Sequence, residues 1–182
     1  MITSNEWEDF DLIDAGNGER LEKWGNYVLQ RPDPQVVWPI IDDNKKLWTN
    51  IDAHYIRSQK GGGHWEYFSN LPERWIVKYK QLSFYVQPMG FKHMGLFPEK
   101  AVNWEWIISK IKGRINSGST RVSVLNLFAY TGGATVAAAF AGAEVCHVDA
   151  AKGMVNKAKE NLSISGLQDS KVRFIVDDAI KF

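Results

Sequence analysis

Three short stretches lie at the ends of three predicted strands in the C-terminal half of the chain. They are the glycine turn at 126–133, Asp149, and the Asp-Asp-Ala sequence at 177–179. In an open sheet of parallel strands, ligands bind at the edge where the carboxyl ends of the strands meet. Asp149 stands 17 residues after Gly132, close to the offset of about 20 at which an acidic side chain reaches a ribose diol. The spacing therefore predicts a ligand that contains a nucleoside.

The composition of the glycine turn narrows the choice of ligand. A dinucleotide carries a pyrophosphate, which favours G-x-G-x-x-G, and this chain has only Gly132 and Gly133 at the turn. Two adjacent glycines allow close approach of an uncharged or zwitterionic group, such as the methionine part of S-adenosylmethionine. At the third strand, the Asp178 carboxylate could accept the N6 hydrogens of adenine and the Ala179 amide could donate to N1. One S-adenosylmethionine molecule would then span three strand ends.

Each of these features also has a purely structural explanation. Asp149 alone is explained by a helix N-cap, and Asp177 with Asp178 by a solvated turn. The order and spacing of all three stretches together favour a ligand site instead. Cys146 and His147 lie inside or beside the second strand, away from the ligand edge, and are interpreted as structural.

The elements that must position these residues alternate between strands and helices. A nearly continuous apolar run predicts a strand at 122–128, as expected in a parallel sheet, and further strands are predicted at 144–149 and 171–177. Helices are predicted between them at 135–141 and 154–163. This β-α-β-α-β pattern, with right-handed crossovers, predicts a parallel sheet.

An amphipathic helix is predicted at 99–115, before the first of these strands. Pro98 and Glu99 suit its start, because proline needs no amide hydrogen there and an acidic side chain is stabilised at the positive end of the helix dipole. The apolar residues follow the i, i+3, i+4, i+7, i+11 spacing of a single helical face. They are Trp104, Ile107, Ile108, Ile111 and Ile115.

The N-terminal half has a different composition. All eight tryptophans lie within the first 106 residues, and the chain then becomes rich in alanine, valine and glycine. Runs of β-branched and aromatic residues predict antiparallel strands at 75–80 and 82–86, and a further strand is predicted at 91–97. We therefore expect a small antiparallel β-rich domain at 1–96 and an α/β domain at 97–182.

Charge is distributed unevenly, although the net charge of the chain is only +1. Residues 1–43 contain three Lys/Arg against ten Asp/Glu, which gives −7, and residues 44–114 contain twelve against five, which gives +7. Aromatic residues interleave the basic segment and could stack on unpaired bases of a nucleic acid. Alternating aromatics are, however, more often core residues, and the acidic leader could fold back on the basic face. The aromatics are Trp48, Tyr55, Trp65, Tyr67, Phe68, Trp75, Tyr79, Phe84 and Tyr85.

The remaining composition bears on location and metal binding. The single cysteine, Cys146, excludes an intramolecular disulfide and a zinc site built on cysteine pairs, and it fits a reducing compartment. The N-terminus lacks the basic and apolar regions of a signal peptide, and no apolar stretch approaches the roughly 20 residues that span a bilayer. We therefore expect a cytoplasmic protein without a metal site.

The motifs at the three strand ends resemble those of a known family. V-L-N-L-F-A-Y-T-G-G, V-D-A and V-D-D-A look like the first three cofactor motifs of class I S-adenosylmethionine-dependent methyltransferases. More narrowly, they are similar to the branch related to large-subunit ribosomal RNA cytosine-C5 methyltransferases. Three upstream segments resemble the N-terminal part of bacterial members of that branch: L-I-D-A-G-N-G-E-R-L-E-K-W-G, R-P-D-P-Q and G-L-F-P-E-K-A-V-N-W.

The resemblance implies an α/β fold, in which the N-terminal part of a Rossmann-like methyltransferase sheet, with three parallel strands and helices, follows the small β-rich domain. It implies an S-adenosylmethionine-dependent methyltransferase that acts on RNA. The segment Phe97–Glu99 would lie over the cofactor, and Tyr130 and Thr131 would border its methionine end. The implied cofactor-binding residues are Asn126, Phe128, Tyr130, Thr131, Gly132, Gly133, Asp149, Asp177, Asp178 and Ala179.

The chain departs from the family after its third strand. Family members continue to a fourth strand that ends in D-P-P beside the transferred methyl group, whereas this sequence ends at Phe182. No residue can therefore be named as nucleophile or base, and we expect a cofactor-binding portion that is inactive alone. In the family strand order 3-2-1-4-5-7-6 the first strand is central. Its free edge would favour self-association, unless the N-terminal domain covers it.

Two other classes of function remain open. The chain could be a non-catalytic nucleic-acid-binding or interaction module that uses the basic aromatic face at 44–114. A nicotinamide-dependent oxidoreductase is disfavoured, because G-x-G-x-x-G is missing.

Overall fold

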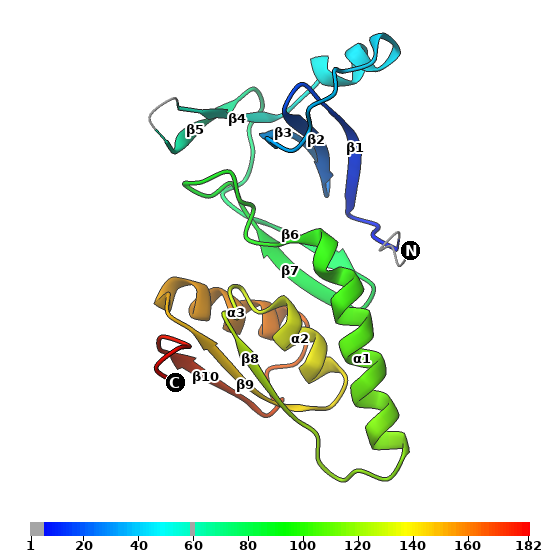
Figure 1. Cartoon of the computed structure of the whole chain (residues 1–182), viewed down its shortest axis with the longest axis vertical. Helices are drawn as coiled ribbons and strands as arrows, with labels where there is room; N and C mark the ends of the chain where they lie inside the picture. The colour runs from blue at the N-terminus through cyan, green and yellow to red at the C-terminus, as the bar shows by residue number, and fades with distance from the viewer. Residues whose placement is uncertain (1–5, 59–60) are drawn as a thin grey trace. The chain divides into compact units, whose positions relative to one another are not determined.

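The computed structural model of the chain describes residues 6–58 and 61–182, which are drawn in colour in Figure 1. The chain divides into two compact units, here called the N-terminal and the C-terminal unit. Independent domains at 1–96 and 97–182 stay a prediction, because compactness alone does not show which part folds by itself. In the described residues, the N-terminal unit contains 7–78 and 86–95, and the C-terminal unit contains Glu6, 79–85 and 96–182.

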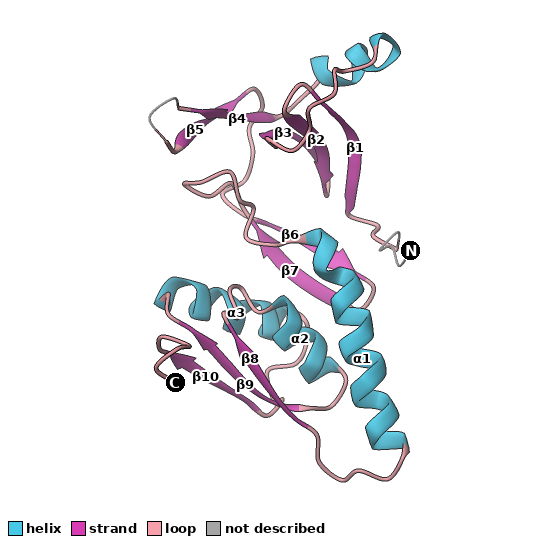
Figure 2. Ribbon diagram, in the orientation of Figure 1, coloured by secondary structure: helices cyan, strands magenta, loops and turns pink. Residues whose placement is uncertain are grey.

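The N-terminal unit is built on a five-stranded sheet. Its strands are β1 (Phe10–Gly16), β2 (Glu19–Trp24), β3 (Tyr27–Pro32), β4 (Ala53–Arg57) and β5 (Gly63–Tyr67), with the 3₁₀ helix η1 (Asp42–Thr49) between β3 and β4 in the sequence. The strands lie in chain order (Figure 2), and neighbours are antiparallel except for the parallel pair β3 and β4. Asn17 and Gly18 join β1 to β2 with positive φ at both residues (53° and 78°), as a tight hairpin requires.

A two-stranded sheet follows in the chain. β6 (Trp75–Tyr79) and β7 (Leu82–Val86) confirm the two strands predicted there. The third predicted strand, at 91–97, is wrong, because the chain forms a loop that satisfies its own backbone groups. The Met89 amide, for example, donates to the His93 carbonyl over 3.1 Å. The Gln87 amide likewise donates to the Met94 carbonyl (3.1 Å), so carbonyls of the predicted strand are used inside the loop and are not available to pair with a neighbouring strand.

The C-terminal unit contains the predicted β-α-β-α-β arrangement. Its elements are β8 (Ser123–Leu127), α2 (Gly133–Phe140), β9 (Glu144–Asp149), α3 (Lys152–Ile164) and β10 (Val172–Val176). β9 lies between β8 and β10, and both pairs are parallel. The sheet is therefore parallel as predicted, and the carboxyl ends of its three strands meet at one edge.

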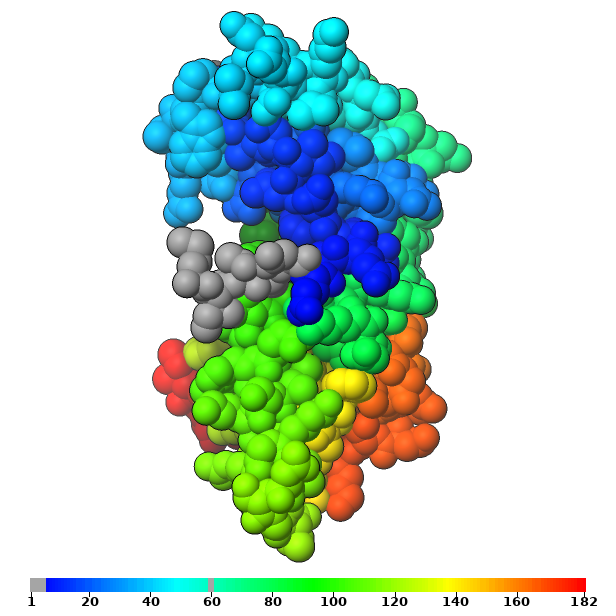
Figure 3. Space-filling model, turned by 90° about the vertical axis from the view of Figure 1, so that its right-hand side faces the viewer, coloured from blue at the N-terminus to red at the C-terminus, as the bar shows by residue number. Residues whose placement is uncertain are grey.

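Three helices pack together in this unit. α1 (Ala101–Asn116), preceded by the 3₁₀ turn η2 (Pro98–Lys100), packs on α2, and α2 packs on α3. Figure 3 shows α1, α2 and α3 side by side in green, yellow and orange. The predicted apolar face of α1 is buried at Trp104 and Ile111, but Ile115 at its end is 39% exposed. In the described parts of the chain, no helix has both the length and the apolar character needed to cross a bilayer.

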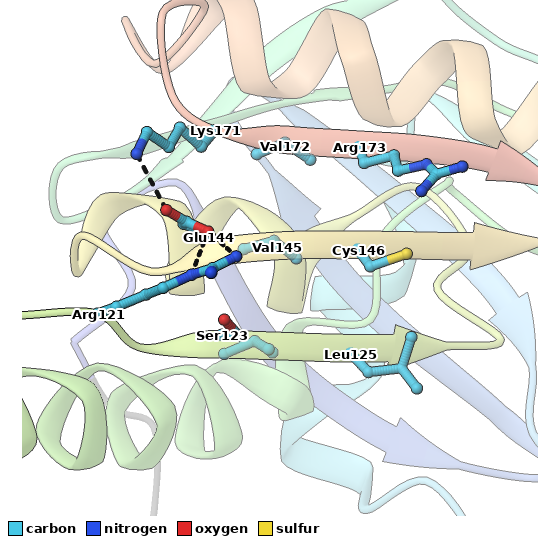
Figure 4. A pocket seen from close by; sticks show the side chains of 10 residues that line it. Arg121, Ser123, Leu125, Glu144, Val145, Cys146, Lys171, Val172 and Arg173 are labelled. Carbon is cyan, nitrogen blue, oxygen red and sulfur yellow. Dashed lines mark hydrogen bonds and ion pairs between the residues drawn. The ribbon is translucent and has the colours of Figure 1, made fainter.

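The sheet of the C-terminal unit has one exposed face and one unpaired edge. Leu125 is 56% exposed, and it lies beside Cys146 on the neighbouring strand (Figure 4). Where the strands begin, Glu144 pairs with Arg121 (2.6 Å) and Lys171 (3.0 Å). A broad hollow of about 590 Å³ lies on this face. Among the described residues β8 pairs with β9 alone, so the other edge of β8 is unpaired.

The half-buried Asn126 and the buried Thr135 and His147 form a chain of polar side chains that links β8, α2 and β9. The Asn126 amide donates to the Thr135 hydroxyl (2.9 Å), and this hydroxyl lies 2.9 Å from Nδ1 of His147. His147 is fully buried, its ring packs on Phe174 with 5.0 Å between centroids, and its Nε2 has no hydrogen-bond partner among the described residues. Burial lowers the pKa of His147 to about 4, although attraction to Asp149 opposes this shift. The imidazole is therefore neutral at pH 7.

Acid is expected to destabilise the fold through His147. Its pKa is about 4 in the folded chain and 6.5 ordinarily, so the unfolded chain takes up the proton first as the pH falls. The contribution of neutral His147 to the free energy of unfolding is complete above pH 6.5 or so, and about 2 kcal/mol is lost by pH 5. Urea unfolding at neutral pH and near pH 5 measures this loss.

The control for this prediction is His147→Asn, which keeps a hydrogen-bonding group near Thr135 and does not titrate in this range. Carboxyl groups affect both proteins equally, so the variant should lose less free energy of unfolding than the wild type over the same pH interval. Equal losses in the two proteins would show that His147 is not the responsible group.

Candidate functional site

The turn between β8 and α2 has an uncommon backbone conformation. Phe128 and Tyr130 have positive φ (51° and 52°), and so does Gly132 (84°). For a residue other than glycine, this conformation costs of order 1 kcal/mol or more, so surrounding contacts must hold it. One such contact joins the turn to the neighbouring strand, because the Ala129 amide donates to the Val148 carbonyl over 3.1 Å.

The carboxylate of Asp149 fastens the same turn. One of its oxygens accepts a hydrogen bond from the Tyr130 amide (2.8 Å), and the other accepts one from the Ala151 amide (2.9 Å). Ala151 is itself the N-cap of α3, without a side-chain cap. Asp149 is thus not a simple N-cap. It connects the turn after β8 to the entry of α3, and it remains half-buried.

The two glycines of the turn are required by helix packing. A Cβ on Gly132 would lie 2.8 Å from the Cβ of Ala158 in α3, and a Cβ on Gly133 would lie 2.7 Å from the ring of Trp104 in α1. A real Cβ is essentially never this close to a non-bonded carbon atom. Both helices therefore approach the turn more closely than a residue with a side chain would allow. Close approach of the helices α1 and α3, and not only of a ligand as the sequence predicts, therefore requires glycine at both positions.

The end of β10 lies next to the end of β9. The Asp177 amide donates to the Asp149 carbonyl over 3.2 Å. Asp178 then organises the following turn, since its carboxylate accepts a hydrogen bond from the Ile180 amide (3.0 Å). Asp177 is exposed, whereas Asp178 and Ala179 are half-buried. The acidic residues of the second and third strands therefore occupy one edge of the sheet.

A cavity of about 350 Å³ lies between the glycine turn and the start of α1. One side is formed by the Phe97 ring, which stacks in a tilted arrangement on Tyr130 with 5.2 Å between centroids. Lys100 and Asn103 add polar groups that the sequence analysis missed, because a helical face is recognised by its apolar residues. Glu99 is exposed and does not line the cavity.

The structure divides the ten predicted cofactor-binding residues into two groups. Five line the cavity: Asn126, Phe128, Tyr130, Thr131 and Gly133. The other five lie outside its wall but at or near the same sheet edge: Gly132, Asp149, Asp177, Asp178 and Ala179. Their role in cofactor binding stays a prediction.

The chemistry of the edge is suited to an adenosine-containing amino acid. Carboxylates at the ends of β9 and β10 match the hydroxyl and amino donors of adenosine. The aromatic wall formed by Phe97, Tyr130 and Trp104 suits an apolar or planar group, and the ammonium of Lys100 suits a carboxylate. This donor set fits S-adenosylmethionine.

Comparison with known proteins gives an independent result. A family model described as S-adenosylmethionine-dependent methyltransferase matches residues 51–182. Two ribosomal RNA large subunit methyltransferases K/L are similar in sequence. The one from Shewanella frigidimarina is 33% identical over 68% of this chain and 16% of its own length, and the one from Shewanella woodyi is 34% identical over 69% and 17%.

A solved structure is similar over nearly the whole chain. The SAM-dependent methyltransferase from Agrobacterium tumefaciens has a TM-score of 0.87 and 40% identity over 97% of this chain. The match covers 55% of that protein, so this chain spans about half of its length and a much smaller part of the Shewanella relatives. The residues matched by the family model, 51–182, include β8, β9, β10 and the glycine turn. The chain belongs to the S-adenosylmethionine-dependent methyltransferases.

Proposed function

We propose that the chain is the cofactor-binding portion of a methyltransferase that uses S-adenosylmethionine to methylate RNA. The observation that carries this proposal is the single sheet edge at which the glycine turn, Asp149 and Asp178 meet beside an aromatic cavity. The adenosine and methionine parts of the cofactor need different binding groups a few ångströms apart. In this proposal the carboxylates at the edge bind adenosine, and the turn with its cavity binds methionine. Membership of the methyltransferase family supports the same reading.

Each part of the cofactor is assigned to a strand end. Asp149 accepts hydrogen bonds from the ribose hydroxyls, and Asp178 with the Ala179 amide binds the edge of adenine. The methionine end lies along the turn at Tyr130 and Thr131, where Lys100 offers a charge for its carboxylate. The remaining predicted residues shape these contacts through the backbone: Asn126, Phe128, Gly132, Gly133 and Asp177.

Catalysis by such a site rests on positioning. When bound, the cofactor supplies a methyl group attached to a sulfonium. The neutral thioether that remains after methyl transfer is a good leaving group. The residues of this chain would bind and orient the cofactor, and the stacked rings of Phe97 and Tyr130 would form one wall of its site. No residue of the chain is assigned as nucleophile or base, and we expect the chain alone to be inactive.

RNA as the acceptor is supported by the names of the Shewanella relatives and by the basic segment at 44–114. If the chain instead serves only as a nucleic-acid-binding or interaction module, RNA binding should persist when Asp149 is replaced, and cofactor binding should be absent. We further propose that residues 1–96 and 97–182 act as separate domains, and that the protein works in the cytoplasm, where a single unpaired cysteine stays reduced.

We also propose self-association through the exposed part of the β8–β10 sheet. Within the part of the chain that the structure describes, β8 pairs on one side only, and Leu125 (56% exposed) and Leu127 (38% exposed) add apolar surface beside its other edge. An edge of this kind pairs readily with another strand.

Cofactor binding is tested by isothermal titration calorimetry with S-adenosylhomocysteine. The wild-type chain should bind it and should not bind NAD. Asp149→Asn should weaken binding about tenfold or more, because a charged acceptor for the ribose hydroxyls is lost. Asp169→Asn, which changes an exposed aspartate outside the site, should bind like the wild type.

The calorimetric stoichiometry separates a binding defect from misfolding in this experiment. A folded Asp149→Asn variant keeps a stoichiometry near one and shows a higher dissociation constant. Wild-type affinity in this variant would contradict the assignment of Asp149, and tighter binding of NAD would contradict the cofactor.

Self-association is tested by size-exclusion chromatography with light scattering. The wild-type chain should show a mass above that of the monomer, and Leu125→Arg should shift it toward the monomer by placing a charge on the apolar face. Val37→Arg is the matched control, because Val37 is 87% exposed and belongs to the other unit. A clean wild-type monomer would rule out this contact.

A further inference from the structure

The N-terminal unit contains a hollow of about 350 Å³ that has no part in the proposed cofactor site. The buried side chain of Tyr55 contributes to its wall, and the walls also carry Arg57, Phe91, Lys92 and His93. These residues come from β4 and from the loop at 88–94, where a strand was wrongly predicted. We call this feature the Phe91 hollow.

The loop that carries Phe91 is firmly anchored. The Arg31 guanidinium donates to the Lys92 carbonyl (2.6 Å), and the Lys92 ammonium donates to the Pro32 carbonyl (3.0 Å). The indole of Trp65 donates to the Met89 carbonyl (2.8 Å). Despite these anchors, the Phe91 ring itself is 68% exposed. A large apolar side chain held in water by a fixed loop costs free energy, which a flat ligand stacked on its face would recover.

Positive charge is in excess around this hollow. The buried carboxylate of Glu22 is paired with Arg31 (2.6 Å), and Asp33 is paired with Arg20 (2.6 Å). Each of these pairs is neutral, and among the described residues neither Arg57 nor Lys92 forms an ion pair with an acid. An anionic group bound in the hollow would balance them.

The pKa shifts of Lys92 and His93 agree with an excess of positive charge around the hollow. Burial lowers the pKa of Lys92; Asp33 opposes the shift, and Arg20, Arg31 and Arg57 add to it. Burial also lowers the pKa of His93, as do Arg31 and Lys92, so His93 is neutral at pH 7 and can both donate and accept a hydrogen bond.

We propose that the Phe91 hollow binds an unpaired nucleotide of RNA, with the base stacked on Phe91 and the phosphate held by Arg57 and Lys92. A nucleotide combines the flat ring, the negative charge and the hydrogen-bonding edge that the hollow accommodates, and base stacking on an exposed aromatic ring is a common means of holding single strands. A duplex hides its base faces and would not fit. This inference rests on the proposed action on RNA, and it places one RNA contact in the N-terminal unit.

The test is fluorescence anisotropy with a short, labelled single-stranded RNA of mixed sequence and the full chain. Phe91→Ala should weaken binding about fivefold or more, because a stacked base is lost. Trp38→Ala is the matched control: Trp38 is 52% exposed in the same unit, lies outside the basic segment at 44–114 and does not line the hollow. It should bind like the wild type.

Salt dependence tests the phosphate contact separately. Arg57→Ala should reduce the slope of log affinity against log salt by about 0.7, the value for one phosphate of a single strand. Lys23→Ala removes an exposed positive charge that lies outside the basic segment at 44–114 and does not line the hollow, and it should leave the slope unchanged. The same RNA annealed to its complement should bind more weakly than the single strand.

The inference is overturned if Phe91→Ala and Trp38→Ala bind alike, if the duplex binds as tightly as the single strand, or if the wild-type chain does not bind RNA. Calorimetry with S-adenosylhomocysteine on the same preparations distinguishes this failure from failure of the proposed function. Phe91→Ala should keep the wild-type affinity for S-adenosylhomocysteine, since Phe91 belongs to the other unit and does not line the candidate cofactor site.

Discussion

The candidate cofactor site depends on one carboxylate that binds two backbone amides. Asp149 receives hydrogen bonds from Tyr130 and Ala151, and it thereby joins the turn after β8 to the entry of α3. Without it, Tyr130 would be held at positive φ by fewer contacts, and the ring that stacks on Phe97 would lose its fixed position. The carboxylate therefore organises the cavity before any ligand arrives, so that little ordering remains to be done on binding.

The interior of the C-terminal unit supports this arrangement with neutral polar groups and small side chains. The chain from Asn126 through Thr135 to His147 connects two strands and a helix, and the lowered pKa of His147 keeps a charge out of this layer. Gly132 and Gly133 let α3 and α1 approach the turn closely. Close packing beneath the sheet edge therefore keeps the edge rigid. Binding sites are commonly held in place in this way, by packed helices and strands.

Much of the C-terminal fold could be predicted because parallel strands buried under helices leave a strong apolar signal. The strands at 144–149 and 82–86 were predicted to the residue, and β8 and β10 within one residue at each end. The prediction of a strand at 91–97 was wrong, because apolar residues of this segment line a hollow and belong to an anchored loop. Local sequence also could not place Lys100 and Asn103 in the cavity, nor explain Gly133 by Trp104, because those contacts join segments far apart in the chain.

The contact between Gly133 and Trp104 has a consequence for how related sequences can diverge. The indole occupies the volume that any side chain at 133 would need, so the two positions share a fixed amount of space. A single substitution at 133 meets the ring, and a single smaller residue at 104 leaves a void beneath Phe84 and Tyr79, whose rings pack on the indole. Evolution at these two sites is therefore coupled, and homologues with a larger residue at 133 should carry a compensating smaller one at 104.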